Sequence, residues 1–123
     1  MTDILLVDDD REYTKDTADL LKHHGYRVHV ANDLGTAMCE MQTHSPHSVI
    51  ADKNIGGHRG VAPFLDYMQT EYPCVIIILS SNEDGAQAVR ELYCHGFISK
   101  HLPIGKFIER MNAILKSPGQ KYN

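Results

Sequence analysis

Acidic, hydroxyl and ammonium side chains each follow a short apolar run in this chain. Asp52 ends the run SVIAD (48–52), and the glycine-containing stretch KNIGGHRG (53–60) comes next. Such an Asp is often only a turn residue, because its side chain hydrogen-bonds the backbone of the turn that it opens. Asp52 becomes a candidate reactive group if other polar side chains converge on it. The residues that follow other apolar runs are Asp8, Asp9, Ser80 and Lys100.

These side chain types have a chemistry in common. Crowded carboxylates raise one another's pKa unless a cation neutralises them, and oxygen ligands with room for water are those that Mg²⁺ prefers. A lysine ammonium adds a mobile positive charge, and a serine hydroxyl can donate a hydrogen bond to an oxygen. The set therefore suits Mg²⁺ together with a tetrahedral phosphoryl group on Asp52.

Four apolar runs and a weaker fifth predict strands that are buried on both faces of a parallel sheet. They are DILLVD (3–8), YRVHV (26–30), SVIAD (48–52), CVIIILS (74–80) and FIS (97–99). Between them lie apolar stripes with helical spacing, which run from Tyr13 to His24, Leu34 to Met41, Phe64 to Met68, Ala86 to Tyr93 and Ile104 to Leu115. Strict alternation of strand and helix predicts one α/β domain with a parallel sheet covered on both faces.

This fold class gives the polar residues a common location. In an open doubly wound sheet, reactive groups collect at the carboxyl ends of the strands. Asp8 and Asp9 leave the first predicted strand, Asp52 ends the third, Ser80 ends the fourth and Lys100 follows the fifth. Their convergence favours a reactive Asp52 over a turn residue, because such a cluster without a bound ion would be a costly way to end strands.

Composition restricts the partners and the compartment. The chain has 123 residues, 42% of them hydrophobic, and a formal net charge of −4. This charge gives no basic surface, so we expect no direct binding of nucleic acid by this chain. Three cysteines at no metal-binding spacing, without a long apolar span or signal peptide, indicate a cytoplasmic protein with no membrane segment.

Eight histidines are many for this length and raise the alternative of a zinc site. Close pairs are His23 with His24, His44 with His47, and His95 with His101. None of these pairs repeats at four-residue spacing within an unbroken helical pattern, and a proline interrupts the second pair. We therefore expect histidines scattered over the surface and no structural zinc ion.

In order and spacing, the polar residues resemble those of the receiver domains of two-component response regulators, from ILLVDDD (4–10) to the last predicted helix. The resemblance implies a flavodoxin-like, doubly wound (βα)5 fold with strand order 2-1-3-4-5. It implies a receiver domain over residues 1–116 and a polar tail over 117–123. It also implies a signalling switch in a phosphorelay, which catalyses only its own phosphorylation and dephosphorylation and is not otherwise an enzyme.

The resemblance assigns roles around the phosphoryl group. Asp52 matches the phosphoacceptor, which receives its phosphoryl group from the phosphohistidine of a histidine kinase. Asp8 and Asp9 match the acidic pair that binds Mg²⁺ together with the phosphoacceptor, and the second of the pair is the direct ligand. Asn54 matches the residue that adds a backbone carbonyl to the metal site.

Further matches concern the response to phosphorylation. Ser80, 28 positions after Asp52, matches the switch hydroxyl, and Lys100 matches the lysine that pairs with the phosphate. Phe97, three residues before Lys100, matches the switching aromatic residue. Expected partners are a sensor histidine kinase or phosphotransfer protein, and an effector domain or second copy on the surface of the fourth helix, fifth strand and fifth helix.

Several residues depart from the family pattern. Ile55 and Gly56 stand where Met and Pro are common, which predicts a more mobile loop. Ser81 replaces the usual Ala or Gly and is expected to narrow access to the site, while His101 in place of Pro predicts a trans peptide bond. The stretch 80–100 is about two residues shorter than usual, which predicts an atypical signalling surface.

Two alternatives remain open from the sequence. One is a protein-binding module that keeps the fold but no longer cycles phosphate, which Gly56, Ser81 and His101 would favour. The other is an enzyme of similar architecture, such as a flavin carrier or an Asp-nucleophile phosphatase. The second is disfavoured because GGHRG (56–60) is no phosphate-binding P-loop and no Asp stands two residues after Asp52.

Overall fold

The computed structural model describes residues 3–56, 60–82 and 86–117, and its strands and helices lie close to the predicted runs and stripes. The strands are β1 (Asp3–Val7), β2 (Arg27–Ala31), β3 (Ser48–Asp52), β4 (Ile76–Ser81) and β5 (Gly96–Ser99). The helices are α1 (Arg11–His23), α2 (Leu34–His44), α3 (Ala62–Glu71), α4 (Ala86–Glu91) and α5 (Ile104–Lys116). Beyond Ser117, the predicted polar tail lies outside the described residues.

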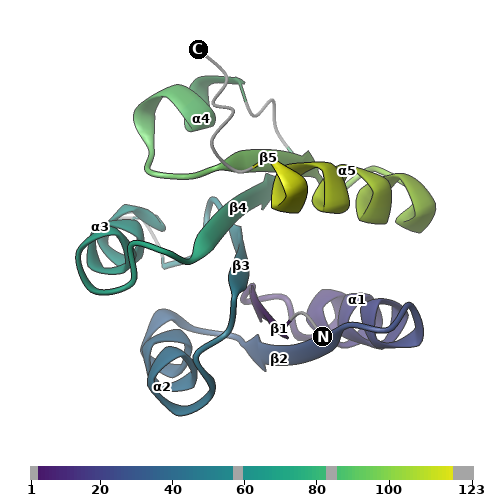
Figure 1. Ribbon diagram of the computed structural model, residues 1–123, viewed down its shortest axis with the longest axis horizontal. Helices are drawn as coiled ribbons and strands as arrows, with labels where there is room; N and C mark the ends of the chain where they lie inside the picture. Colours follow the sequence, from purple (N-terminus) through teal and green to yellow (C-terminus); the bar gives the residue numbers. More distant parts are fainter. Residues whose placement is uncertain (1–2, 57–59, 83–85, 118–123) are drawn as a thin grey trace.

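The five strands form one parallel sheet in the order β2-β1-β3-β4-β5. Figure 1 shows α1 and α5 on one face of this sheet and α2, α3 and α4 on the other. This arrangement confirms the predicted doubly wound, flavodoxin-like α/β fold. Because all strands run in the same direction, their carboxyl ends share one edge of the sheet, as the placement of the polar residues requires. Among the described residues, no helix combines the length and apolar character needed to cross a membrane.

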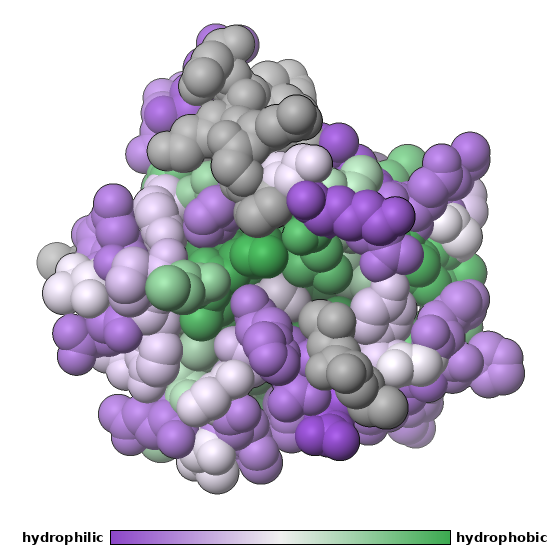
Figure 2. Space-filling view, viewed as in Figure 1, coloured by the Kyte–Doolittle hydropathy of each residue, from purple (hydrophilic) through white to green (hydrophobic). Residues whose placement is uncertain are grey.

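Two apolar clusters, one on each face of the sheet, hold the layers together. The cluster below α2 and α3 includes Leu5, Val49, Ile77, Met41, Phe64 and Met68. The cluster below α1 and α5 includes Ile4, Leu6, Ile50, Ile78, Leu21, Phe107 and Met111. Successive residues of a strand point to opposite faces, so the continuous apolar runs supply both clusters. Figure 2 shows one face of the molecule, on which apolar residues lie near the centre and hydrophilic residues cover most of the periphery.

Aspartate N-caps fix where α1 and α2 begin. The side chain of Asp10 accepts a hydrogen bond from the Tyr13 N–H at 3.0 Å, and that of Asp33 accepts one from the Thr36 N–H at 2.7 Å. An N-cap of this kind stabilises a helix by about 1 kcal/mol. Since the caps lie three and two residues after the ends of β1 and β2, they help to set the direction in which the chain leaves the carboxyl edge of the sheet.

The structure differs from the predicted pattern at α4. This helix ends at Glu91, so Leu92 and Tyr93, which the predicted stripe includes, lie outside it. Both side chains instead pack against the cluster below α2 and α3, because the chain turns inward there to enter β5. The prediction that they belong to the helix is therefore wrong. The described part of the helix has six residues, which is consistent with the short stretch 80–100.

The loop after β3 is closely packed at its described residues. Ile55 is buried in the core, and Gly56 has a φ of +93°. A Cβ at Gly56 would lie 2.8 Å from the carbonyl oxygen of Gly60 and 2.9 Å from Cδ1 of Leu34. Only glycine fits this conformation and this space. Ile55 and Gly56 are thus closely packed, residues 57–59 lie outside the described part of the chain, and the greater mobility of the loop stays a prediction.

Candidate functional site

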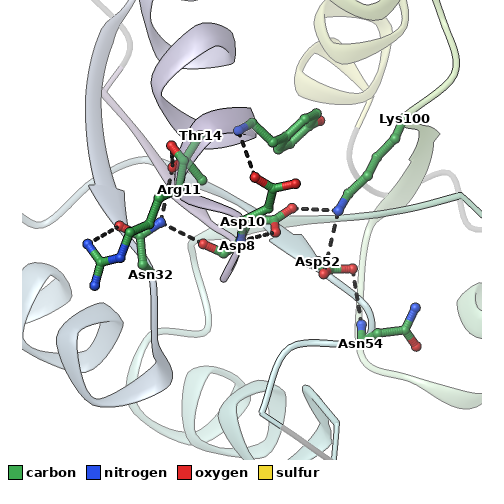
Figure 3. Close-up of polar contacts among 9 residues, drawn as sticks. Asp8, Asp10, Arg11, Thr14, Asn32, Asp52, Asn54 and Lys100 are labelled. Atoms are coloured by element: carbon green, nitrogen blue, oxygen red, sulfur yellow. Dashed lines mark hydrogen bonds and ion pairs between the residues drawn. The ribbon is translucent and has the colours of Figure 1, made fainter.

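The carboxyl edge of the sheet brings together the acidic residues and the lysine that the sequence singles out. Carboxylate oxygens of Asp8, Asp9 and Asp52 lie within 4.8 Å of one another. Asp8 and Asp52 are buried, whereas Asp9 is exposed to solvent. Figure 3 shows the side chain of Lys100 extending from the end of β5 toward Asp8 and Asp52. The predicted convergence of these four residues is therefore present in the structure.

Lys100 joins the two buried carboxylates. Its Nζ lies 2.6 Å from Oδ2 of Asp8 and 3.5 Å from Oδ2 of Asp52. Its backbone N–H donates to the carbonyl of Ser81 at 3.0 Å, which fixes the end of β5 beside β4. The ring of Tyr13 lies 4.8 Å from the same Nζ, within the range of a cation–π interaction. The ammonium group is thus held by two carboxylates and one aromatic ring.

Burial and charge pairing have opposite effects on the pKa values of this pair. Burial raises the pKa of Asp8, and hydrogen bonds from Lys100 and from the Asp10 N–H only partly offset that rise. Burial alone would lower the pKa of Lys100, but its hydrogen bond to Asp8 and the charges of Asp8 and Asp52 outweigh burial, and this pKa is raised. Lys100 therefore stays charged at neutral pH, while ionisation of Asp8 costs folding free energy.

Backbone N–H groups orient the two buried carboxylates. The N–H of Asp10 donates to Oδ1 of Asp8 at 3.0 Å, and the N–H of Asn54 donates to Oδ1 of Asp52 at 3.2 Å (Figure 3). In each carboxylate, Oδ1 is therefore held by the loop that follows the strand, and Oδ2 faces Lys100. Charge-assisted hydrogen bonds of this type are stronger than neutral ones, so the orientation is well defined.

Ser80 lies beside Asp52 on the neighbouring strand. The two residues are register partners in β3 and β4, so their side chains leave the sheet on the same face. The Ser80 hydroxyl is buried and has no hydrogen-bond partner among the residues that the structure describes. An unsatisfied buried polar group costs roughly 1–3 kcal/mol. An oxygen-bearing ligand on Asp52 would satisfy it.

Phe97 and His101 occupy the strand and loop on either side of Lys100. Phe97 is half-buried in β5 and packs against the cluster below α2 and α3. His101 is exposed, and its N–H donates to the Ser99 hydroxyl at 3.2 Å. No peptide bond of the described residues is cis, which confirms the trans bond predicted before His101.

Two contributors to the site were not predicted as site residues from the sequence. Asn32, directly after β2, donates to the Asp8 carbonyl at 2.7 Å and to the Thr14 hydroxyl at 3.0 Å, and thereby ties β2 and α1 to the end of β1 (Figure 3). The sequence feature that could have identified Asn32 as a site residue is its position close to the end of a predicted strand. Tyr13 was assigned only to an apolar stripe, because its contact with Lys100 depends on how α1 is rotated on the sheet.

The donor set of this site suits a hard divalent cation. Asp8, Asp9 and Asp52 offer oxygen ligands only, and the exposure of Asp9 leaves room for the water molecules that Mg²⁺ retains. Three carboxylates with one ammonium group leave a formal surplus of negative charge, which a divalent cation would neutralise. The residues therefore fit Mg²⁺ beside Lys100.

Comparisons with known proteins agree with this fold. A family model described as the response regulator receiver domain matches residues 4–112. The KDP operon transcriptional regulatory protein KdpE of Escherichia coli is 25% identical over 117 residues, which are 94% of this chain and 52% of that protein. The chain thus spans about half the length of that relative.

Solved structures with low sequence identity share the fold. The chemotaxis response regulator CheY4 of Vibrio cholerae superposes with a TM-score of 0.83 at 19% identity, over 93% of this chain and 98% of that one. NtrX from Brucella abortus gives 0.85 at 22% identity, over 97% of this chain and 28% of that one. At such identities the likeness supports the arrangement of strands and helices alone.

Replacing Asp8 by Asn tests the cost of its buried charge. Asp8→Asn keeps the size of the side chain and an oxygen for the Asp10 N–H, but removes a carboxylate whose pKa is raised by burial. Without divalent cations at pH 7, we expect the free energy of unfolding to rise by roughly 0.5–2 kcal/mol. The gain should shrink as the pH falls and Asp8 of the parent protein takes up its proton.

Urea denaturation followed by circular dichroism measures this change. The matched control is Asp9→Asn, since Asp9 belongs to the same cluster but is exposed, and its substitution should alter stability by less than about 0.5 kcal/mol. A loss of stability in Asp8→Asn would contradict the account, because it would mean that the ion pair with Lys100 outweighs the cost of burial.

Proposed function

Because the chain belongs to the response regulator receiver domain family, we propose that it is a phosphorylation-controlled signalling switch of a two-component phosphorelay. In this proposal Asp52 accepts a phosphoryl group from the phosphohistidine of a sensor histidine kinase or phosphotransfer protein. The observation that carries it is the pairing of Lys100 with Asp8 and Asp52 beside the exposed Asp9. We assign the receiver domain to residues 1–116 and a tail to 117–123, supported by the family match over 4–112 and the end of α5 at Lys116.

Mg²⁺ is the proposed cofactor. Its ligands would be the carboxylates of Asp9 and Asp52 and the backbone carbonyl of Asn54, with Asp8 acting through bound water. Support comes from the oxygen-only cluster and from Asn54, whose N–H already contacts Asp52. When bound, Mg²⁺ would neutralise charge on the carboxylates and on the transferring phosphoryl oxygens.

Phosphoryl transfer requires a carboxylate oxygen in line with the bond that breaks. An oxygen of Asp52 forms a new bond to phosphorus while the P–N bond of the phosphohistidine breaks, and its electron pair leaves with the imidazole. Because the Asn54 N–H holds Oδ1, Oδ2 is the oxygen that we assign to the attack. Lys100, now 3.5 Å from Oδ2, would pair with one transferred oxygen, and the unsatisfied Ser80 hydroxyl would donate to another.

Transmission of the signal is assigned to Ser80 and Phe97. The phosphoryl group adds about −1.5 to −2 charges beside Ser80 and Lys100, so the Ser80 side chain would move toward it. Phe97 would then turn inward into the vacated space, from its present half-buried position in β5. The surface formed by α4, β5 and α5 would change with it, and an effector domain or second copy is the proposed partner there.

Alternative functions receive less support. Membership of the receiver domain family supports a signalling switch over a flavin carrier or a phosphatase. We propose that its only catalysis is its own phosphorylation and dephosphorylation. In a protein-binding module that no longer cycles phosphate, no phosphoryl group would bond the buried Ser80 hydroxyl beside Asp52, and the cost of leaving this hydroxyl unsatisfied would not be offset. Narrowed access at Ser81, whose side chain is buried, remains a prediction that would appear as slow phosphorylation.

Chemical phosphorylation tests the assignment of Asp52. Incubation with acetyl phosphate and Mg²⁺ should add one phosphoryl group to the intact protein, as measured by mass spectrometry, and Asp52→Asn should abolish the addition because the attacking oxygen is lost. Asp16→Asn is a matched control on the exposed surface of α1 and should be labelled like the parent protein. Labelling that persists in Asp52→Asn would refute the assignment.

The switch is tested with beryllofluoride, which mimics a phosphoryl group on a carboxylate. With Mg²⁺ present, the ring resonances of Phe97 should shift on its addition, whereas those of Phe64, which is fully buried in the core, should not. In Ser80→Ala the amide resonances around Asp52 should still respond, but Phe97 should lose its response. A Phe97 ring that stays unchanged in the parent protein while Asp52 responds would rule out the switch and leave the phosphorylation chemistry intact.

A further inference from the structure

A second group of metal-ligating side chains lies between β2 and α2 and shares no residue with the site at the carboxyl edge. It consists of His29 in β2 and Glu40 and His44 in α2, and one ligand atom of each lies within 4.8 Å of the other two. His29 and Glu40 are half-buried, and His44 is exposed. We propose that these three residues bind a divalent transition-metal ion, with Zn²⁺ as the best fit.

Helical spacing and strand register bring the three residues together. Glu40 and His44 are four positions apart on α2 and share one face, with Oε2 of Glu40 3.1 Å from Nε2 of His44. His29 is the register partner of Leu5, whose side chain belongs to the cluster below α2 and α3. His29 therefore points toward α2, where its ring stacks on that of His44 with 4.0 Å between centroids. The expectation of scattered histidines does not hold for this pair.

The chemistry of these ligands differs from that of the aspartate cluster. Two imidazoles and one carboxylate suit Zn²⁺ and related transition metals, whereas Mg²⁺ and Ca²⁺ prefer oxygen ligands. Zinc bonds of about 2.0–2.2 Å in tetrahedral geometry place ligand atoms roughly 3.4 Å apart. The contact between Glu40 and His44 is already close to that spacing. Three protein ligands would leave the fourth position open to water or to a group from another molecule.

Binding would require one ring to turn. The planes of the two imidazoles lie at 16° to one another, so their in-plane lone pairs run nearly side by side and do not converge. His44 is the last residue of α2 and is exposed, so its side chain can turn at little cost in packing. His29 is half-buried in the strand and would keep its place. On metal binding, the rings of His29 and His44 should therefore no longer stack, and one nitrogen of each should point toward the ion.

The consequence for the fold is a link between α2 and an edge strand. Among the described strands, β2 is paired only with β1, so a metal ion bound by both β2 and α2 would stabilise this edge of the sheet. The segment between them contains Asn32, whose side chain holds the Asp8 carbonyl at 2.7 Å. An ion at His29, Glu40 and His44 would thus stabilise the elements that flank the phosphoryl site without occupying it.

Titration of the whole chain with ZnCl₂ tests the proposal. Excess Mg²⁺ is kept present, and an Asp9→Ala, Asp52→Ala double variant is titrated in parallel, so that binding at the aspartate cluster is recognised separately. We expect one saturable zinc ion per chain in both proteins by isothermal titration calorimetry, with shifts of the His29 and His44 ring nitrogens in NMR spectra. Titration with CoCl₂ should give the visible absorption bands of tetrahedral cobalt.

His44→Gln and Glu40→Gln should lower the zinc affinity about tenfold or more, and they should leave the far-ultraviolet circular dichroism unchanged because neither side chain is fully buried. The matched control is His24→Gln, an exposed histidine at the end of α1 that lies outside the cluster, and its zinc affinity should equal that of the parent protein. Zinc affinity that is unchanged in both His44→Gln and Glu40→Gln, or absence of saturable zinc binding in the parent protein, would overturn the proposal.

Discussion

The contacts of one lysine ammonium with two buried carboxylates are the interaction on which the candidate site depends. Without Lys100, the negative charges of Asp8 and Asp52 would lie unpaired at the buried edge of the sheet. Their mutual repulsion and their desolvation would both raise the free-energy cost of folding. Lys100 compensates only part of this cost, because Asp9 brings a third carboxylate to the same place. The carboxyl edge of the sheet therefore keeps a formal surplus of negative charge in the folded protein. This surplus of negative charge would attract a divalent cation, and in the proposed function the bound cation and Lys100 would offset the charge of the phosphoryl group.

The remaining elements can be understood as the support for this arrangement. The parallel sheet delivers Asp8, Asp52 and Lys100 to one edge, since all of its strands end there. The Asp10 N-cap starts α1 immediately after Asp8, and Asn32 ties the end of β2 to the same loop. The two apolar clusters hold the helices against the sheet, so in the proposed switch a change of charge at the edge would be met by movement of side chains near β4 and β5. The half-buried Phe97 is placed to take part in such a movement.

Much of this could be predicted from the sequence, and the exceptions share a physical cause. Continuous apolar runs predicted all five strands because both faces of a central parallel sheet are buried, and strand ends then located Asp8, Asp52 and Lys100. Contacts between side chains from different layers could not be predicted in this way. The ring of Tyr13 near Lys100 and the stacking of His29 on His44 depend on how α1 and α2 sit on the sheet. The need for glycine at position 56 likewise arises from a close approach by Gly60 and Leu34.

Titration with Mg²⁺, followed by amide resonances, tests whether the aspartate cluster is a magnesium-dependent phosphoryl site. We expect saturable shifts centred on Asp9, Asp52 and Asn54. These shifts should disappear in the Asp9→Ala, Asp52→Ala double variant because the proposed carboxylate ligands are gone. His44→Gln, which alters only the distant histidine cluster, should bind Mg²⁺ like the parent protein. An unchanged Mg²⁺ affinity in the double variant would contradict the account.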